Sequence, residues 1–465
     1  MADIFNRIDF SSGSVDKEGL ADWSMVTPVC LIIEEGERMK SSIEKIILRK
    51  KEYFIKYLEE IVSIDSSVIQ MGKQGKEQGA QRIVEKKLKD LGACVDVFCP
   101  DNSEMENHPE FNHGHSYQDR PNVVGIIKGT GGGRSLLINA HIDVVPPGDE
   151  KNWATHPFKP VIRNGKLFGR GSCDMKAGGA AALMALEILK ECGVKLKGDV
   201  IYESVVDEEG GGNGTLACCM KGYKADAAII PEPTELNLMP AHMGWMFYRI
   251  TFTGKPVHCA FKWNGINAIE KCLSFMAMMR EVERQWMIEK RHPYLPPPTI
   301  CFTVIQGGTS SSTVPEQCSL DMSVHFHPCE TIEGKIGARI EEELMHNISN
   351  FIQGDDWLKE NPPRVEKFQQ GSAYDIGSDH PFVKCVAESL FDITGRPPLV
   401  KGLASGADAR LINNYAETPS LLCGPGSISD AHSANEFVEI QQYMDAISMF
   451  CDVIIKWCGV ADGSN

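Results

Sequence analysis

The chain has 465 residues, of which 42% are hydrophobic, and it carries a formal net charge of −16. Its length allows two or three domains with a sizeable core, and its negative charge argues against nucleic acid or an anionic membrane as the main partner. No stretch approaches the roughly eighteen apolar residues of a membrane helix, and the N-terminal region lacks the basic and apolar segments of a secretory signal. We therefore expect a cytoplasmic protein.

The 16 cysteines favour the same location. They are spread along the chain without a C-x-x-C pair, whereas disulfide scaffolds are short and rich in cysteine. Reduced thiols in a cytoplasmic protein account for them best. None lies in a recognisable nucleophile context, so a catalytic cysteine is not expected.

Residues 1–42 are mixed and polar and receive no predicted role. From Ile43 onward, apolar residues recur at helical spacing, and helical and strand-like segments then alternate to about residue 243. Helices are predicted from Ile43, near Gly79–Leu91 and after Asp174, and strands at Ala93–Phe98, Asn122–Ile127, Leu136–Ala140, Asp199–Val206 and Ala227–Ile230. This alternation is typical of a layered α/β fold.

The pattern changes near residue 244. A strand–helix–strand–strand–helix–strand order predicts a separate small α/β sandwich inserted into the larger domain. Its segments are predicted at Trp245–Phe252, Gly265–Lys290, Thr299–Gln306, Gln317–His325 and Ile332–Ile348. The first pattern returns with a helix at Pro381–Gly395, a strand at Ser420–Cys423 and a helix at Ile440–Trp457. We therefore divide the chain into residues 1–42, 43–243, 244–372 and 373–465, with the second and fourth parts forming one domain.

Five potential metal ligands lie in turn-like contexts between apolar runs: His141, Asp174, Glu209, Glu232 and His432. Two imidazoles and three carboxylates suit a pair of zinc ions held around a shared carboxylate. A hydrolase is therefore the leading interpretation.

The neighbours of these residues favour the same interpretation. Residues i and i+2 of a strand point the same way, so Asp143 is expected to hold the free ring nitrogen of His141. Glycines flank Asp174 and allow a metal cluster to approach closely. Glu208 adjoins Glu209, so that one carboxylate can bind metal while the other accepts a proton from metal-bound water.

Each motif also has a structural interpretation. A histidine at a strand end is more often structural than a ligand, Asp174 can simply cap the following helix, and a Glu-Glu pair is usually a solvated turn. The apolar strand before Glu208 and the three glycines after Glu209 favour a cramped site instead. The metal interpretation is preferred because five such coincidences are improbable.

From about Ile43 to the C-terminus, these motifs together resemble the di-zinc metallohydrolases typified by acetylornithine deacetylase, succinyl-diaminopimelate desuccinylase, aminoacylase and glutamate carboxypeptidase. The resemblance implies that Asp174 bridges two zinc ions, which cobalt or manganese could replace. It places His141 with Glu232 on one ion and Glu209 with His432 on the other. It makes Asp143 the residue that orients His141, and Glu208 the general base. The inserted domain becomes a lid through which two subunits form a homodimer.

The resemblance also assigns His258, which in relatives reaches the active site of the partner subunit and stabilises the oxyanion. Two positions depart from the family pattern, because Ser312 stands where Asn is frequent and His325 where Arg is frequent. In relatives these residues help to hold the substrate, and histidine cannot reproduce the bidentate carboxylate clamp of arginine. We therefore expect either that Arg410 supplies a substitute cation or that the substrate carries no carboxylate at that point. Some relatives that remove formyl or other acyl groups from amines share the His-Phe-x-Pro sequence that begins at His325.

The expected reaction is hydrolysis of the amide bond of a small N-acyl amino compound. The second interpretation is a metallo-exopeptidase that cleaves dipeptides or C-terminal residues, since such an enzyme uses the same chemistry. A non-catalytic metal- or ligand-binding relative is the third interpretation. The presence of Glu208 disfavours it, because a pure binder has no use for a general base.

Overall fold

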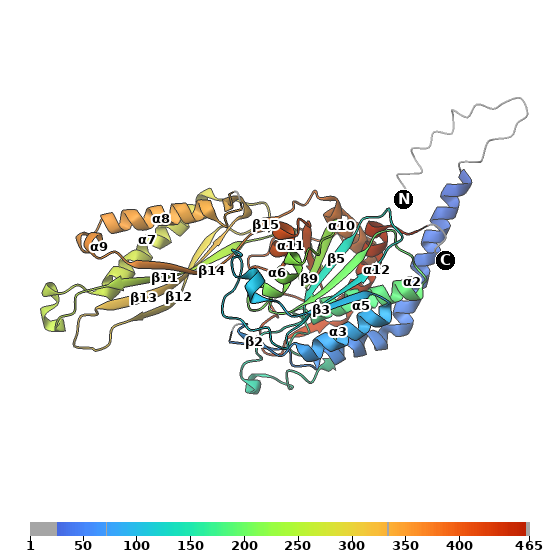
Figure 1. Cartoon of the computed structure of the whole chain (residues 1–465), viewed down its shortest axis with the longest axis horizontal. Helices are drawn as coiled ribbons and strands as arrows, with labels where there is room; N and C mark the ends of the chain where they lie inside the picture. Colours follow the sequence, from blue (N-terminus) through green and yellow to red (C-terminus); the bar gives the residue numbers. More distant parts are fainter. Residues whose placement is uncertain (1–25, 71, 333, 462–465) are drawn as a thin grey trace, which may run out of the picture.

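The computed structural model describes residues 26–70, 72–332 and 334–461, with side chains from residue 38 onward. Two large hydrophobic cores divide this part of the chain into an α/β catalytic domain and an elongated lid (Figure 1). All of the lid core lies between residues 246 and 373. The predicted fold, a layered α/β domain with an inserted lid, is confirmed.

The catalytic domain is built on a six-stranded sheet. In chain order its strands are β3 (Cys94–Phe98), β4 (Asn122–Ile127), β5 (Leu136–His141), β8 (Val200–Val205), β9 (Ala227–Pro233) and β16 (Ser420–Gly424). Their spatial order is β16-β9-β5-β8-β4-β3, and β16, β9, β5 and β8 run parallel. Every residue of β5, β8 and β9 is buried, as expected of strands covered on both faces.

Helices cover both faces of this sheet (Figure 1). On one face, α5 (Lys176–Glu191) and α12 (Ile440–Cys458) pack with α2 (Val26–Val62), α3 (Gln78–Leu91) and α10 (Pro381–Thr394). On the other face lie α6 (Asn213–Met220) and α11 (Ala409–Tyr415). None of the helices in the described part of the chain combines the length and apolarity needed to cross a bilayer.

Helix α2 begins inside the predicted N-terminal extension. Residues 1–25 lie outside the described residues, but the helix continues without a break from Val26 to Val62. The residues of its predicted apolar face are buried: Ile43, Ile47, Phe54, Leu58 and Ile61. At least residues 26–42 therefore continue into a helix of the catalytic domain.

Several short elements complete the catalytic domain. They are β1 (Val68–Ile69), β2 (Gln74–Gly75), α4 (Asn102–Met105), η2 (Glu150–Asn152), β6 (Val161–Arg163), β7 (Lys166–Phe168) and β17 (Phe437–Glu439). Strand β17 pairs with β7, so that Phe437 lies opposite Phe168. This pairing brings the segment that follows His432 beside the segment that precedes Asp174.

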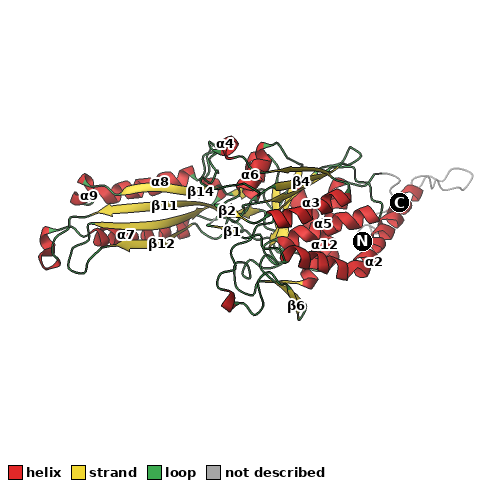
Figure 2. Ribbon diagram, turned by 60° about the horizontal axis from the view of Figure 1, so that its bottom comes forward, coloured by secondary structure: helices red, strands yellow, loops and turns green. Residues whose placement is uncertain are grey.

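The lid is a four-stranded antiparallel sheet covered by helices on one face (Figure 2). Its elements are β11 (Gly244–Thr253), η3 (Cys259–Asn264), α7 (Ala268–Glu289), β12 (Thr299–Gly307), β13 (Gln317–Phe326), η4 (Pro328–Glu330), α8 (Ala338–Gln353), α9 (Asp356–Glu360) and β14 (Arg364–Gly371). The strand order is β12-β13-β11-β14. Along β11, buried residues alternate with more exposed ones, which confirms the predicted half-exposed strand.

The chain enters and leaves the lid through two paired strands, β10 (Ala241–His242) and β15 (Tyr374–Asp375). Strand β11 therefore starts beside the catalytic domain at Gly244 and ends at Thr253, at the distal end of the lid (Figure 1). Strand β13 is antiparallel to β11 and returns toward the catalytic domain. These directions decide which lid residues lie near the predicted site.

Candidate metal centre

The structure brings the five predicted ligands together at one edge of the catalytic sheet. His141 ends β5, Glu232 lies in β9, and Glu209 lies in the turn after β8. His432 follows β16, and Asp174 precedes α5. The carboxyl ends of parallel strands meet at the same edge, which is where α/β proteins place their ligands.

Asp174 lies between two groups of ligands. Its Oδ1 is 3.0 Å from Nε2 of His141, and its Oδ2 is 3.3 Å from Nε2 of His432. Glu232 Oε1 is 3.8 Å from His141 Nε2, and Glu209 Oε2 is 3.0 Å from His432 Nε2. Within each group of three, the ligand atoms all lie within 4.8 Å of one another. One carboxylate is thus positioned to be shared by two ions.

The chemistry of this donor set fits divalent metal ions. Burial, and then the charge of Asp174, raise the pKa of Glu232 well above its ordinary value. Burial also raises the pKa of Glu208, and the carboxylate of Glu232 adds to the effect. Crowded carboxylates of this kind are unfavourable unless cations bind among them. Mixed imidazole and carboxylate ligands suit zinc, and also cobalt or manganese.

His432 has a backbone conformation that is uncommon for its residue type. Its φ angle is 59°, in the left-handed region, and its side chain is more exposed than those of the other ligands. Non-glycine residues held in this region tend to lie at functional sites. The conformation directs the imidazole toward Asp174 and Glu209.

Asp143 contacts the ring of His141 mainly through its backbone. Nδ1 of His141 is 3.0 Å from the backbone carbonyl oxygen of Asp143, whereas the Asp143 carboxylate is 3.8 Å away. The carboxylate instead accepts the backbone N–H groups of Glu208 and Glu209, at 3.3 Å and 3.0 Å. Because a carbonyl oxygen can only accept, Nδ1 of His141 carries the proton and Nε2 remains available to a metal.

Sequence reasoning did not assign a role to Glu436. Its Oε1 accepts the backbone N–H groups of Cys173 and Asp174, at 2.8 Å and 3.1 Å, and its Oε2 accepts a 2.6 Å bond from Arg170. Glu436 therefore holds the backbone that presents the shared carboxylate. The only signal in the sequence was its position four residues after His432.

The structure places the guanidinium of Arg410, which was predicted to bind substrate, inside the protein. Its guanidinium is buried and donates to Glu110 Oε2 at 2.9 Å, to the carbonyl of Ala407 at 2.8 Å and to the carbonyl of Gly211 at 2.9 Å. It also lies over the ring of Trp245. With each of its nitrogens bonded inside the protein, this cation is part of the structure rather than a free carboxylate clamp.

The other three predicted residues lie in the lid, in two places. His325 pairs with Trp245 across β13 and β11, at the end of the lid that joins the catalytic domain. His258 and Ser312 lie beside each other at the distal end, where Cys259 N–H donates to the Ser312 carbonyl at 2.8 Å. Within one subunit, the structure thus separates His258 and Ser312 from the metal ligands.

Residues 137–456 match the peptidase family M20/M25/M40, and this span exceeds half of the chain. The chain belongs to the M20 peptidase family. Two N-formyl-4-amino-5-aminomethyl-2-methylpyrimidine deformylases, from Bacillus subtilis and Halalkalibacterium halodurans, are each 32% identical to this M20 protein over 82% of its length and 89% of theirs. A probable succinyl-diaminopimelate desuccinylase of Staphylococcus aureus is 27% identical over 73% of this chain and 87% of the relative. The family and these relatives confirm the prediction that the protein is an amide-bond hydrolase.

A solved structure of a Staphylococcus aureus tripeptidase shares the fold of this M20 protein. It superposes with a TM-score of 0.69 and covers 88% of this chain and 98% of the tripeptidase, at 20% identity. At this identity the likeness shows the fold alone.

Proposed function

We propose that this M20 protein removes an acyl group from the nitrogen of a small amine, using two divalent metal ions. The observation that carries the proposal is the pair of ligand groups that share Asp174, with the non-ligand carboxyl of Glu208 beside them. The relatives at 32% identity are named as deformylases. A formyl group is therefore the first acyl group to test.

The chain supplies the following parts of the reaction. His141, Glu232, Glu209 and His432 would hold two ions around Asp174, and bound ions of this kind acidify water and polarise an acyl oxygen. Glu208 accepts the proton of the attacking water and returns it to the leaving nitrogen.

The lid favours a substrate without a carboxylate at the position that relatives clamp. Arg410 is bonded within the protein, and burial lowers the pKa of His325, so that its imidazole is neutral at neutral pH. A neutral imidazole can hydrogen-bond an uncharged amine or a ring nitrogen, whereas it binds a carboxylate far less well than arginine does.

We also propose that two subunits form a homodimer through the lid. Strand β12 is at the edge of the lid sheet and exposes Val304 and Ile305, and an apolar edge strand is suited to pair with a second chain. A second subunit would also allow the distant His258 to act at a metal site. Mixing inactive His258→Ala and Glu208→Gln proteins tests this, because subunit exchange would assemble one intact site per heterodimer. No regained activity after exchange would exclude His258 acting in the partner's site.

We propose that the protein is located in the cytoplasm, because its cysteine thiols are free. The cysteines whose side chains the structure describes, from Cys94 onward, are all free, including the buried ones. Such thiols are typical of proteins kept in a reducing compartment. Fractionation of cells that express the full chain would test this.

The function is tested with metal-stripped protein, to which zinc or cobalt is restored, on N-formyl, N-acetyl and N-succinyl amines and amino acids and on dipeptides. We expect metal-dependent release of the acyl group, with carboxylate-free amines preferred. Release of amino acids from dipeptides alone would favour the exopeptidase. Absence of turnover by protein that binds two metal ions would favour the non-catalytic interpretation.

A further inference from the structure

Residues 109–117, here called the bridging loop, connect the lid with the turn that carries Glu208. The loop lies between α4 and β4 in the catalytic domain. One end contacts the lid strand β14 and the residue that follows it, and the other end contacts Asp207. Nothing in the reaction described above uses these contacts.

At the catalytic end, the bridging loop holds Asp207, the residue before Glu208. Asp207 is fully buried, and its Oδ2 accepts hydrogen bonds from the Tyr117 hydroxyl and from Nδ1 of His115, the latter at 2.8 Å. Its φ angle is 69°, a conformation that a non-glycine residue adopts only when its surroundings enforce it. These two hydrogen bonds, together with one from Nη2 of Arg120 to Asp207 Oδ1 at 3.3 Å, supply that enforcement and fix where the chain turns into Glu208.

The middle of the loop packs against the same turn. Nδ2 of Asn112 donates to the Gly211 carbonyl at 2.8 Å. The approach is so close that a Cβ on Gly211 would lie 2.4 Å from that Nδ2 atom. Any displacement of the loop would therefore be transmitted to the turn.

At the lid end, three residues of one lid segment bind the loop. Gln369 Nε2 donates to Asn112 Oδ1 and Gln370 Nε2 donates to the Pro109 carbonyl, both at 3.1 Å. The backbone N–H and hydroxyl of Ser372 both donate to the buried carboxylate of Glu110. These hydrogen bonds therefore hold the loop against the end of β14, the strand through which the chain leaves the lid.

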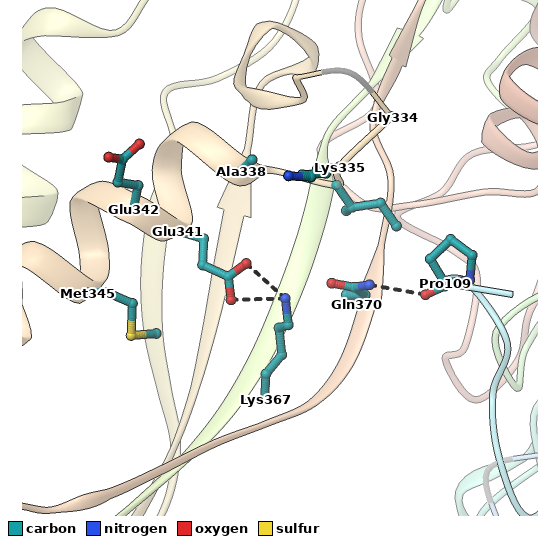
Figure 3. Close-up of a pocket in the computed structure, with 10 residues that line it drawn as sticks. Pro109, Gly334, Lys335, Ala338, Glu341, Glu342, Met345, Lys367 and Gln370 are labelled. Carbon is teal, nitrogen blue, oxygen red and sulfur yellow. Dashed lines mark hydrogen bonds and ion pairs between the residues drawn. The ribbon is translucent and has the colours of Figure 1, made fainter. Parts of the chain in front are cut away.

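A cavity of about 520 Å³ lies beside this junction, between helix α8 and the loop (Figure 3). Pro109 is the only lining residue from the catalytic domain, and the Gln370–Pro109 bond lies at its edge (Figure 3). Next to it, Lys367 pairs with Glu341 inside the lid. The space leaves room for the lid to shift while the polar contacts carry the movement to the loop.

We propose that the bridging loop positions Glu208 and makes that position depend on the lid. His115 and Tyr117 are positioning residues that act through Asp207, and Gln369 and Gln370 connect the loop to the lid. This inference rests on the proposed role of Glu208 as general base.

The catalytic end is tested with Tyr117→Phe, His115→Leu and the double variant, with His115→Asn as the conservative variant that keeps a donor. We expect kcat of the double variant to fall about tenfold or more, within the range that general-base catalysis supplies, while KM and metal content stay within about twofold. We also expect faster amide hydrogen exchange in residues 207–213. His115→Asn should keep most of the wild-type kcat and most of the wild-type protection from amide exchange.

Two results would overturn this part of the inference. One is an unchanged kcat in the folded double variant, and the other is metal loss that accounts for the lost activity. If the double variant does not fold, Tyr117→Phe decides the question with the removal of one hydroxyl. Failure of the proposed function can be distinguished from failure of this inference. If Glu208 is not the general base, Glu208→Gln stays active, whereas the amide exchange of residues 207–213 still reports whether the loop holds the turn.

The lid end is tested with the double variant Gln369→Ala/Gln370→Ala. We expect a smaller fall in kcat, of about two- to fivefold, together with faster exchange in residues 207–213, because a neutral hydrogen bond contributes only modestly. Lys367→Ala on the same strand is the matched control, since it removes a contact within the lid. Equal kcat and equal exchange in the double variant and the control would overturn the link to the lid.

Discussion

The catalytic domain and the lid each contain an arginine–carboxylate ion pair with nearly the same N–O distance, but the first pair is buried and the second is exposed. Arg170 and Glu436, beside the metal ligands, are 2.6 Å apart with side chains 2% and 1% exposed. Arg249 and Asp321, on the open face of the lid sheet, are 2.7 Å apart with side chains 52% and 13% exposed. The two pairs therefore have similar contact distances but differ in burial and in number of contacts, since Arg249 binds Asp321 through two nitrogens and Arg170 binds Glu436 through one.

This difference follows from what each domain has to do. The catalytic domain must keep carboxylates away from water for its chemistry, and each of them needs a partner that holds it in place. The lid only has to bury one face of a sheet, which apolar residues of α7 and α8 accomplish. Charged residues in the lid can therefore stay at its surface.

The largest effect is expected from Glu208→Gln. The substitution keeps the shape of the side chain but removes the proton acceptor, so kcat should fall by roughly 10²–10⁴. Metal content and the unfolding temperature should stay as in the wild type. Glu342→Gln, in an exposed position of the lid, is the control for the same chemical change. A metal-loaded Glu208→Gln protein with full activity would exclude a general base at this position.

The next largest effect is expected from Arg170→Met. It leaves the buried carboxylate of Glu436 without its cation, and breaking a buried pair in this way costs about 3–5 kcal/mol of unfolding free energy. Urea unfolding measures the loss. Because Glu436 also holds the backbone of Asp174, zinc affinity should decrease as well. A loss below about 1 kcal/mol would mean that burial does not separate the two pairs.

The sequence predicted the strands of the catalytic sheet closely, because they are long and apolar. The predicted strand Asn122–Ile127 is β4 with the same bounds. Strands of two or three residues, such as β10, β15 and β17, are too short for any periodicity and were not predicted. The pairing of β10 with β15 nevertheless decides how the lid joins the domain.

At the site, the residues that end strands were predictable, and their buried partners were not. His141 and Glu232 follow apolar runs that the sequence displays. Glu110, the partner of Arg410, lies 300 residues away along the chain, so no local pattern could reveal that this arginine is engaged. The sequence also could not show that the ring of His141 lies closer to the backbone carbonyl of Asp143, at 3.0 Å, than to its carboxylate, at 3.8 Å.

A smaller effect, dependent on pH, is expected at His242, on the strand that leads into the lid. Burial, and then the charge of Arg410, lower the pKa of this histidine to about 3. The unfolded chain takes up the proton below about pH 6.5 while the folded protein does not, so the contribution of His242 to stability should be constant above that pH and should fall toward pH 3. The slope contributed by His242 is about 1 kcal/mol per pH unit.

Unfolding midpoints in urea at pH 7 and pH 5 measure this slope. His242→Asn should make the difference between the two midpoints smaller, because the variant lacks the group that titrates in the unfolded chain. His346→Asn, at an exposed position of the lid, is the matched control. Equal pH dependence in wild type and His242→Asn would contradict the expected shift.

The smallest effect is expected from Arg249→Met, the lid counterpart of Arg170→Met. The aliphatic part of the side chain is kept, so mainly the ion pair with Asp321 is lost. Exposed pairs contribute little to stability and are screened by salt, so the small loss in low salt should vanish near 1 M NaCl. The loss in Arg170→Met should persist in the same salt, because its partner is shielded from ions. If the two losses responded equally to salt, burial would not be what distinguishes the catalytic domain from the lid.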